Sequence, residues 1–184
     1  NRYFPHIRAH KQWKQGIQGY LASIYFADAM LGRVLDALEK GPHADDTIVV
    51  LWSDHGWHLG EKEHWQKFTA WRVCSRVPLV IRVPKAVSGL PEGTKPSRCT
   101  RPVNLLSLAP TLLELAGISP SALHDGPSLV PLLKNPEADW SHVSLTHLQQ
   151  PGSFGLSDEG WRYIRYANGE EELYDIRKDP FEWN

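Results

Sequence analysis

The chain has 184 residues and a formal net charge of −1, and it is 41% hydrophobic and 22% charged. This composition is typical of a globular protein that is long enough to bury a core. The near-neutral charge and the lack of a basic tract give no reason to expect a nucleic-acid partner, and no apolar run approaches the roughly 20 residues that span a bilayer.

Both ends of the sequence look like cuts through a longer protein. Residues 1–6 are polar and broken by Pro5, so we expect a loop there, and the chain stops at Asn184 without a helix or strand to close it. We therefore interpret the sequence as a piece of a larger protein.

Residues 13–39 are expected to form one long amphipathic helix, because apolar residues recur at three- and four-residue steps. Gly41 and Pro42 should end it. Asp28 lies in line with the apolar stripe. It could be a ligand, but a buried carboxylate bonded to the backbone or to a neighbouring loop is the favoured interpretation. The stripe consists of Ile17, Tyr20, Leu21, Ile24, Leu31, Val34, Leu35 and Leu38.

A β-branched, apolar run over residues 47–52 predicts a buried strand, and Asp54 and His55 follow it directly. In open α/β sheets, ligands bind where such strands end, and a carboxylate beside an imidazole is a good ligand pair for a divalent metal. Gly56 lets the backbone turn sharply after them. The alternative is an ordinary turn in which Asp54 caps the next segment.

Lys67 follows His55 by twelve residues and could hold an anionic substrate beside the metal; otherwise it is a solvated surface lysine. His64 could help to form the substrate pocket, or it could be an ordinary hydrogen-bonded loop histidine. We expect His58 to be structural. Trp57, Trp65 and Trp71 could stack on a sugar, although core packing is favoured for them.

The remaining expected elements are a strand and a helix, followed after residue 140 by short segments with a strand-like pattern. Residues 78–84 predict a second strand bounded by prolines, residues 84–102 a loop, and a helix should begin near Pro110 and end at Gly117. After residue 140, short segments at 142–146, 161–166 and 171–175 predict a small antiparallel sheet, and Asn168-Gly169 predicts a hairpin turn. We expect two units, residues 1–140 in an α/β domain and residues 141–184 in a small β subdomain that is truncated at its end.

Several segments, taken in this order, resemble the C-terminal part of a sulfatase of the alkaline phosphatase-like superfamily. The resemblance is carried by Gly19–Asp28, by Thr47–Gly56, by Leu59-Gly60-Glu61 with Trp65-Gln66-Lys67, by Arg76–Ile81, by Pro110–Leu113, by Leu173-Tyr174-Asp175 and by Asp179-Pro180. The sequence is most similar to iduronate-sulfatase-like and bacterial polysaccharide sulfatases, in which Asp-His replaces the commoner Asp-Asn. The resemblance implies an α/β fold, part of an alkaline phosphatase-like mixed sheet flanked by helices, with a small C-terminal antiparallel sheet.

By match to the family motifs, Asp54 and His55 are metal ligands and Lys67 is a catalytic, sulfate-contacting residue. A divalent metal is implied, with Ca²⁺ favoured by the carboxylate, although an imidazole is a less usual calcium ligand. The implied substrate is a sulfated small molecule or carbohydrate, and relatives of this kind are often periplasmic or secreted. The sequence predicts nothing about oligomeric state.

The family's nucleophile is a formylglycine made from Cys or Ser in Cys/Ser-x-Pro-x-Arg, and this motif is absent from the sequence. Residues 94–98 imitate it, but they begin with Thr94 and follow the Asp-His pair, so we interpret them as a coincidental loop. Cys74 and Cys99 lie outside any such motif and are expected to be unpaired thiols. We therefore expect a sulfuric ester hydrolase whose formylglycine lies upstream, and an isolated chain that is inactive.

Two other functions remain open. The first is a phosphatase, phosphodiesterase or phosphonate hydrolase of the same superfamily, and the second is a non-catalytic remnant or binding module. The Leu-Gly-Glu and Trp-Gln-Lys spacing favours the sulfatase, and the sequence upstream of residue 1 would separate the three.

Overall fold

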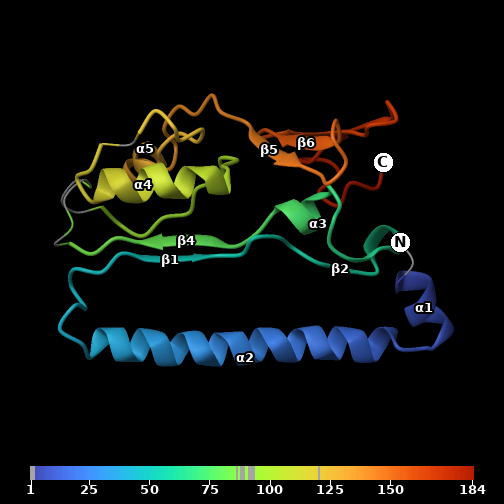
Figure 1. The fold of residues 1–184 in the computed structure, drawn as a ribbon, viewed down its shortest axis with the longest axis horizontal. Coiled ribbons are helices and arrows are strands. Elements are labelled where there is room, and N and C mark those ends of the chain that lie inside the picture. Colours follow the sequence, from blue (N-terminus) through green and yellow to red (C-terminus); the bar gives the residue numbers. More distant parts are fainter. Residues whose placement is uncertain (1–2, 86, 88–89, 91–93, 120) are drawn as a thin grey trace.

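The computed structural model describes residues 3–85, 87, 90, 94–119 and 121–184. Figure 1 shows three layers, with the long helix α2 on one side, strands β1 and β4 in the middle and helix α4 on the other side. A small sheet that contains β5 and β6 lies beyond α3, at the same end of the molecule as α1. Helices on both sides of the β1–β4 pair (Figure 1), together with a separate antiparallel sheet, confirm the predicted α/β fold class.

The N-terminal segment is helical rather than a loop. Helix α1 covers Tyr3–Ala9, and Pro5 falls in its first turn, where the missing N–H needs no partner. Proline was therefore a poor indicator of a loop at this position, and the expectation for residues 1–6 was wrong for the described part of the segment.

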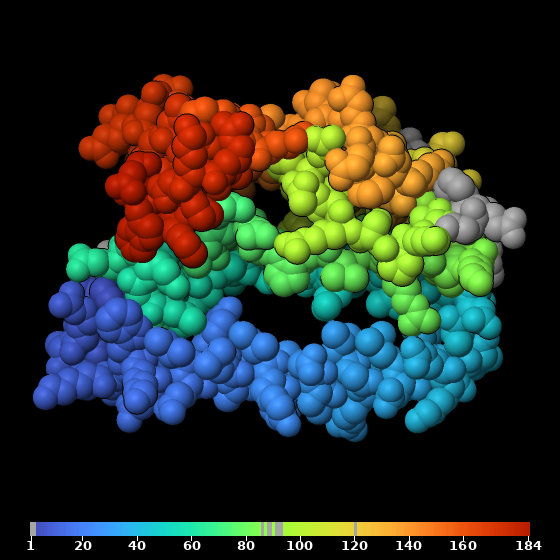
Figure 2. All heavy atoms as spheres, turned by 180° about the vertical axis from the view of Figure 1, so that it is seen from behind, coloured from blue at the N-terminus to red at the C-terminus, as the bar shows by residue number. Residues whose placement is uncertain are grey.

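Helix α2 covers Trp13–Glu39, which confirms the predicted helix, but none of its residues is buried. Ile24 and Val34, both in the predicted stripe, are 51% and 65% exposed. Asp28 is exposed as well, so the expectation of a buried, bonded carboxylate there was wrong. Figure 2 shows open space between much of α2 and the strands that face it. Among the described residues, no helix is long and apolar enough to cross a membrane.

Strands β1 (Val49–Trp52) and β4 (Leu79–Arg82) pair antiparallel, with Val49 opposite Arg82 and Trp52 opposite Leu79. β-branched residues set the extended backbone. The expectation that the first strand is buried was wrong, because Trp52 is 51% exposed and Leu51 is exposed too. The pair forms a ribbon without a neighbouring strand among the described residues.

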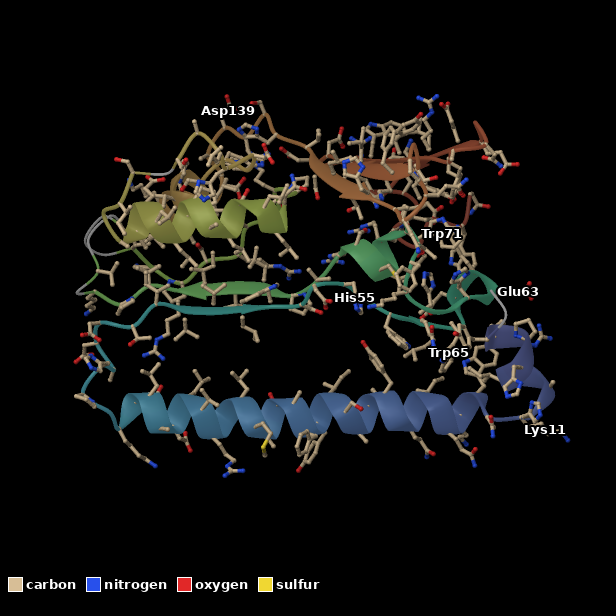
Figure 3. All side chains as sticks on the ribbon, in the orientation of Figure 1. Lys11, His55, Glu63, Trp65, Trp71 and Asp139 are labelled. Atoms are coloured by element: carbon tan, nitrogen blue, oxygen red, sulfur yellow. The ribbon has the colours of Figure 1, made fainter. Side chains whose placement is uncertain are left out.

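A short hairpin follows the candidate site. Strands β2 (His58–Leu59) and β3 (Trp65–Gln66) pair antiparallel around the 3₁₀ turn η1 (Glu61–Glu63), and helix α3 (Arg72–Ser75) comes next. Trp65 is buried, and its ring lies against Gly16 of α2 so closely that a Cβ at Gly16 would be 2.8 Å from a ring carbon. Figure 3 shows Trp65 between the hairpin and α2. The N-terminal part of α2 is therefore held by this hairpin.

The helical layer above β4 is formed by η2 (Leu105–Ser107), α4 (Leu108–Leu115) and α5 (Val130–Lys134). Buried Thr111 joins them, because its hydroxyl donates to the Ser107 carbonyl at 2.5 Å and accepts from the Leu129 amide at 2.8 Å. Gly117 has φ +73°, as the predicted helix stop requires.

Residues beyond 140 form a four-stranded antiparallel sheet in the order β5-β6-β7-β8. Its core is Ile164 and Tyr174 packed on Ala70. The hairpin at Asn168-Gly169 is present, with Tyr166 N–H donating to the Glu170 carbonyl at 2.9 Å. The strand bounds are Ser144–His147, Phe154–Ser157, Trp161–Arg165 and Glu171–Asp175.

Candidate functional site

Asp54 and His55 lie in a tightly pinned turn just after β1. The Ser53 amide donates to the Pro78 carbonyl at 3.3 Å, and the Gly56 amide donates to the Cys74 carbonyl at 2.7 Å. A Cβ at Gly56 would lie 1.9 Å from the Val73 carbonyl oxygen, so this close approach requires glycine. The sequence thus fixes where the two side chains leave the backbone.

The imidazole of His55 is held in one tautomer by its neighbours. Its Nε2 lies 2.8 Å from the Lys67 ammonium, which can only donate, so Nε2 is an acceptor. Its Nδ1 then carries the proton and donates to the Gly56 carbonyl at 2.9 Å. The Nε2 lone pair consequently points to the Lys67 ammonium in this structure, and it is the same lone pair that a metal would bind.

The Asp54 carboxylate lies beside the same nitrogen. Asp54 Oδ2 is 3.3 Å from His55 Nε2, while Oδ1 accepts the His55 amide at 3.1 Å. Asp54 does not cap a helix, since the next helical element along the chain, η1, begins only at Glu61. Asp54, His55 and Lys67 are therefore brought together at one point, whereas the sequence placed Lys67 there only by spacing.

These residues fit part of a divalent metal site. Neighbouring ligands in a coordination shell with bonds of 2.0–2.6 Å are separated by about 3–3.5 Å, which matches the separation of Asp54 Oδ2 and His55 Nε2. Two donors do not complete such a shell. Among the described residues, no group of three or more His, Cys, Asp or Glu side chains is placed to hold a metal ion. The two residues are half of a site at most.

The site opens into a groove of about 1290 Å³. Its walls come from α3 and β4, from the loop before η2 and from strands β5 and β6, so segments far apart in the sequence share it. Among the described residues, six arginines border it and were not predicted as site residues, because arginines scattered through the sequence carry no periodic signal. They are Arg72, Arg76, Arg98, Arg101, Arg162 and Arg177.

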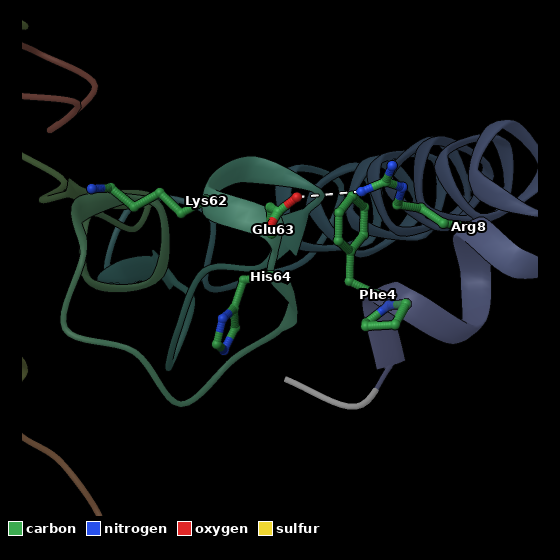
Figure 4. Close-up of a pocket in the computed structure, with 6 residues that line it drawn as sticks. Phe4, Arg8, Lys62, Glu63 and His64 are labelled. Carbon is green, nitrogen blue, oxygen red and sulfur yellow. Dashed lines mark hydrogen bonds and ion pairs between the residues drawn. The ribbon is translucent and has the colours of Figure 1, made fainter.

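His64 lies in a different hollow from the other three predicted site residues. This hollow of about 540 Å³ is also lined by Phe4, Arg8, Lys62 and Glu63, and Figure 4 shows the Arg8–Glu63 ion pair across it. Burial, followed by the neighbouring His58, lowers the pKa of His64 to about 4. The imidazole is therefore neutral near pH 7, and its role in substrate binding stays a prediction.

His58 is fully buried, as expected of a structural residue. Its Nε2 lies 2.7 Å from the Thr69 hydroxyl and its Nδ1 lies 3.2 Å from the Glu61 carbonyl oxygen. Burial lowers its pKa, so it too is neutral near pH 7. Cys74 and Cys99 are both free thiols, as predicted, and Cys74 is buried.

Comparison with known proteins places the chain within a described family. A family model described as Sulfatase matches residues 2–118. A sulfatase of Formosa agariphila is 42% identical over 172 residues, which cover 94% of this chain and 32% of that protein. The N-acetylglucosamine-6-O-sulfatase of Bacteroides thetaiotaomicron is 34% identical, with the same two coverages.

Solved structures agree with the sequence matches. A protein solved in complex with its substrate D-glucosamine-2-N,6-O-disulfate superposes with a TM-score of 0.77 at 32% identity, over 94% of this chain and 36% of that one. The chain spans about a third of the length of the curated relatives that it matches. These matches confirm the resemblance inferred from the sequence motifs.

Proposed function

Because this chain belongs to the sulfatase family, we propose that the protein containing it hydrolyses sulfate esters of sugars. In this proposal, Asp54 and His55 hold a divalent metal, and Lys67 contacts the sulfate group. The superfamily's phosphate- and phosphonate-ester reactions are not favoured by the relatives described above.

The observation that carries the proposal is the convergence of three side chains in the wall of the large groove. The Lys67 ammonium lies 2.8 Å from His55 Nε2, and Oδ2 of the Asp54 carboxylate lies 3.3 Å from the same nitrogen. A cation beside two lone-pair donors is the arrangement that an anionic ester next to a metal requires.

The residues have separate tasks in this mechanism. A bound divalent metal would neutralise charge on the sulfate oxygens and orient the attacking group. Lys67 would place a positive charge against the sulfate or the leaving oxygen, where negative charge grows as the S–O bond breaks. Gly56, through its carbonyl, keeps the His55 Nε2 lone pair directed at the site.

Two parts of the proposal lie outside residues 1–184. We infer that the nucleophile is a formylglycine and that further acidic residues complete the metal shell, as the family resemblance implies. We favour Ca²⁺ because a carboxylate supplies a hard oxygen, and elemental analysis of the purified protein would identify the ion.

The proposed substrate is a sulfated amino sugar, by analogy with the N-acetylglucosamine-6-O-sulfatase and with the solved complex whose substrate is D-glucosamine-2-N,6-O-disulfate. The cationic groove beyond the site supports a polyanionic substrate, since guanidinium groups bind sulfate in a bidentate manner.

The test is turnover of glucosamine 6-sulfate by the protein containing this chain. We expect Asp54→Asn and Lys67→Met each to lower kcat/KM by about 10²- to 10³-fold, and a chelator to abolish turnover. Lys40→Met, at the exposed end of α2, is the matched control and should leave turnover unchanged. Full activity of the Asp54 and Lys67 variants, or faster hydrolysis of the matching phosphate ester, would overturn the proposal.

The isolated chain should bind metal weakly and turn nothing over, because it supplies two ligands and no formylglycine motif. An aryl sulfate assay of residues 1–184 with added Ca²⁺ checks this expectation. Metal-dependent turnover by the piece alone would show that the site is more complete than its described residues indicate.

A further inference from the structure

The loop that carries Lys67 has an unusual backbone. Lys62 and Glu63 have φ values of +51° and +53°, and the two neighbours of Lys67, Gln66 and Phe68, have φ values of +77° and +72°. Side chains other than glycine rarely adopt this left-handed region, and they remain there only when the surroundings hold them. The position of Lys67 therefore depends on contacts that keep this loop in shape.

Lys62 makes the contact that reaches furthest from the loop. Its ammonium lies 4.7 Å from the ring centre of Trp71, 4.9 Å from that of Tyr174 and 5.6 Å from that of Trp183, and it donates to the Tyr174 hydroxyl at 3.2 Å. Aromatic faces attract cations in this geometry. Figure 4 shows the Lys62 side chain extending away from Phe4 and Arg8, out of the hollow whose rim it shares.

We call these three rings the aromatic cage, and they come from different parts of the chain. Trp71 precedes α3, Tyr174 lies in β8 and Trp183 lies in the C-terminal tail. Lys62 therefore connects the loop to the C-terminal sheet, across 112 residues of sequence.

Glu172 fixes the orientation of the cage. Its Oε2 accepts from Trp71 Nε1 at 2.8 Å and also from the Tyr174 hydroxyl, while Oε1 accepts from the Tyr166 hydroxyl at 2.7 Å. Burial raises the pKa of Glu172, but these hydrogen bonds outweigh it and the pKa is lowered. An ionised carboxylate thus stays behind the rings and adds to the attraction for Lys62.

We propose that Lys62 is a positioning residue: held in the aromatic cage, it fixes the strained loop that presents Lys67 to His55. The C-terminal sheet then controls the geometry of the sulfate-contacting cation, although it contributes neither a metal ligand nor Lys67. This rests on the proposed function for its effect on turnover, but not for its effect on the loop.

Other contacts secure the rest of the hairpin. Trp13 Nε1 donates to the Leu59 carbonyl at 2.6 Å, His58 bonds to Thr69, and Trp65 packs on Gly16. Loss of the Lys62 charge should therefore leave the fold intact and loosen only the turn between β2 and Lys67.

The experiment uses the protein containing this chain and four single variants. They are Lys62→Met, Lys62→Arg, Lys67→Met and the control Lys178→Met, whose side chain is 86% exposed and pairs with Asp175 outside the cage. In Lys62→Met we expect hydrogen exchange of amides 63–69 to rise at least tenfold and kcat/KM to fall about five- to fiftyfold. Lys62→Arg should restore most of both because it keeps a cation over the rings, and Lys178→Met should change neither.

The double variant Lys62→Met/Lys67→Met separates positioning from general stability. If Lys62 acts through Lys67, the double variant is no slower than Lys67→Met alone, whereas independent effects would multiply. Multiplied effects, or unchanged exchange at amides 63–69, would overturn the proposal. Absence of sulfatase turnover in the unaltered protein would count against the proposed function alone, and the exchange data would then decide whether Lys62 holds the loop.

Discussion

The two ends of the molecule differ in how completely they are packed. At one end, the β2–β3 hairpin, α3 and the C-terminal sheet bury Trp65, Ile164 and Tyr174; we call this the packed end. At the other, the C-terminal part of α2 and the ribbon of β1 and β4 leave apolar side chains exposed; we call this the open layer.

The candidate site lies where these two regions meet. Asp54 and His55 leave the end of β1 in the open layer, while Lys67 follows the hairpin of the packed end. The difference is one of partners: the helix and strands of the open layer expose apolar side chains, whereas neighbouring side chains hold those of the packed end. Exposed apolar faces in folded proteins commonly mark surfaces covered by further protein, and the curated relatives are about three times as long as this chain.

The largest expected effect comes from breaking the buried ion pair of the packed end. The side chains of Arg162 and Glu182 are 1% and 3% exposed, with Nε and Oε1 3.9 Å apart. Arg162→Met leaves the Glu182 carboxylate buried without its partner charge, so we expect the local free energy of opening to fall by about 3–5 kcal/mol. Hydrogen exchange of β7 and β8 amides measures this.

Arg165→Met is the matched control, because Arg165 lies on the same strand and is exposed. It should change the free energy of opening by less than about 0.5 kcal/mol. Equal effects of the two variants would mean that the packed end does not depend on its buried pair.

A glycine-to-alanine substitution in α2 should change the free energy of unfolding in opposite directions near the two ends of the helix. A Cβ at Gly16 would meet the Trp65 ring at 2.8 Å, whereas at Gly32 it would meet nothing within 4 Å. Gly32→Ala should stabilise the helix by about 0.5–1 kcal/mol, and Gly16→Ala should destabilise by about 1–2 kcal/mol because the ring must move. Thermal unfolding of both variants checks the signs, and two stabilising variants would contradict the close packing of Trp65 on α2.

The sequence predicts the local backbone of this structure better than it predicts which side chains are buried. Apolar periodicity gave α2, and the β-branched run gave β1, because both patterns act through the local backbone. The exposure of Ile24 and Trp52 could not be predicted, since burial depends on whether a partner surface is present.

Tertiary contacts explain the other differences. Strand β6 (Phe154–Ser157) was not predicted, and its Gly155 leaves room for the Arg162 guanidinium, which would lie 2.5 Å from an added Cβ. The Asp54–His55–Lys67 grouping followed from motif spacing. The sequence around Lys62 could not predict its contact with the Trp183 ring, because the two residues are 121 positions apart.

The stability of the packed end should depend on pH through His64. Burial and the neighbouring His58 lower its pKa from 6.5 to about 4, so the folded state disfavours its protonation. The contribution of neutral His64 to the free energy of unfolding is complete above pH 6.5 and is lost as the pH falls from 6.5 towards 4. Because the ring is only partly buried, we expect a loss of about 1 kcal/mol.

His64→Gln removes the titration while keeping a polar side chain of similar size. The difference in Tm between pH 7 and pH 4.5 should shrink in this variant and persist in His142→Gln, which alters an exposed histidine next to Trp140. An unchanged difference in His64→Gln would mean that other groups carry the acid sensitivity.

The smallest effect is expected in the open layer, where an exposed ion pair joins the end of α2 to β4. Arg82 Nη1 lies 3.5 Å from Glu39 Oε1, and the two side chains are 48% and 60% exposed. Water and salt screen such a pair, so Glu39→Gln should cost less than about 0.5 kcal/mol, and 1 M NaCl should erase the difference. Thermal unfolding at low and high salt measures both. A salt-insensitive loss above about 1.5 kcal/mol would mean that the pair is buried in solution, and that α2 and β4 lie closer together than an open layer allows.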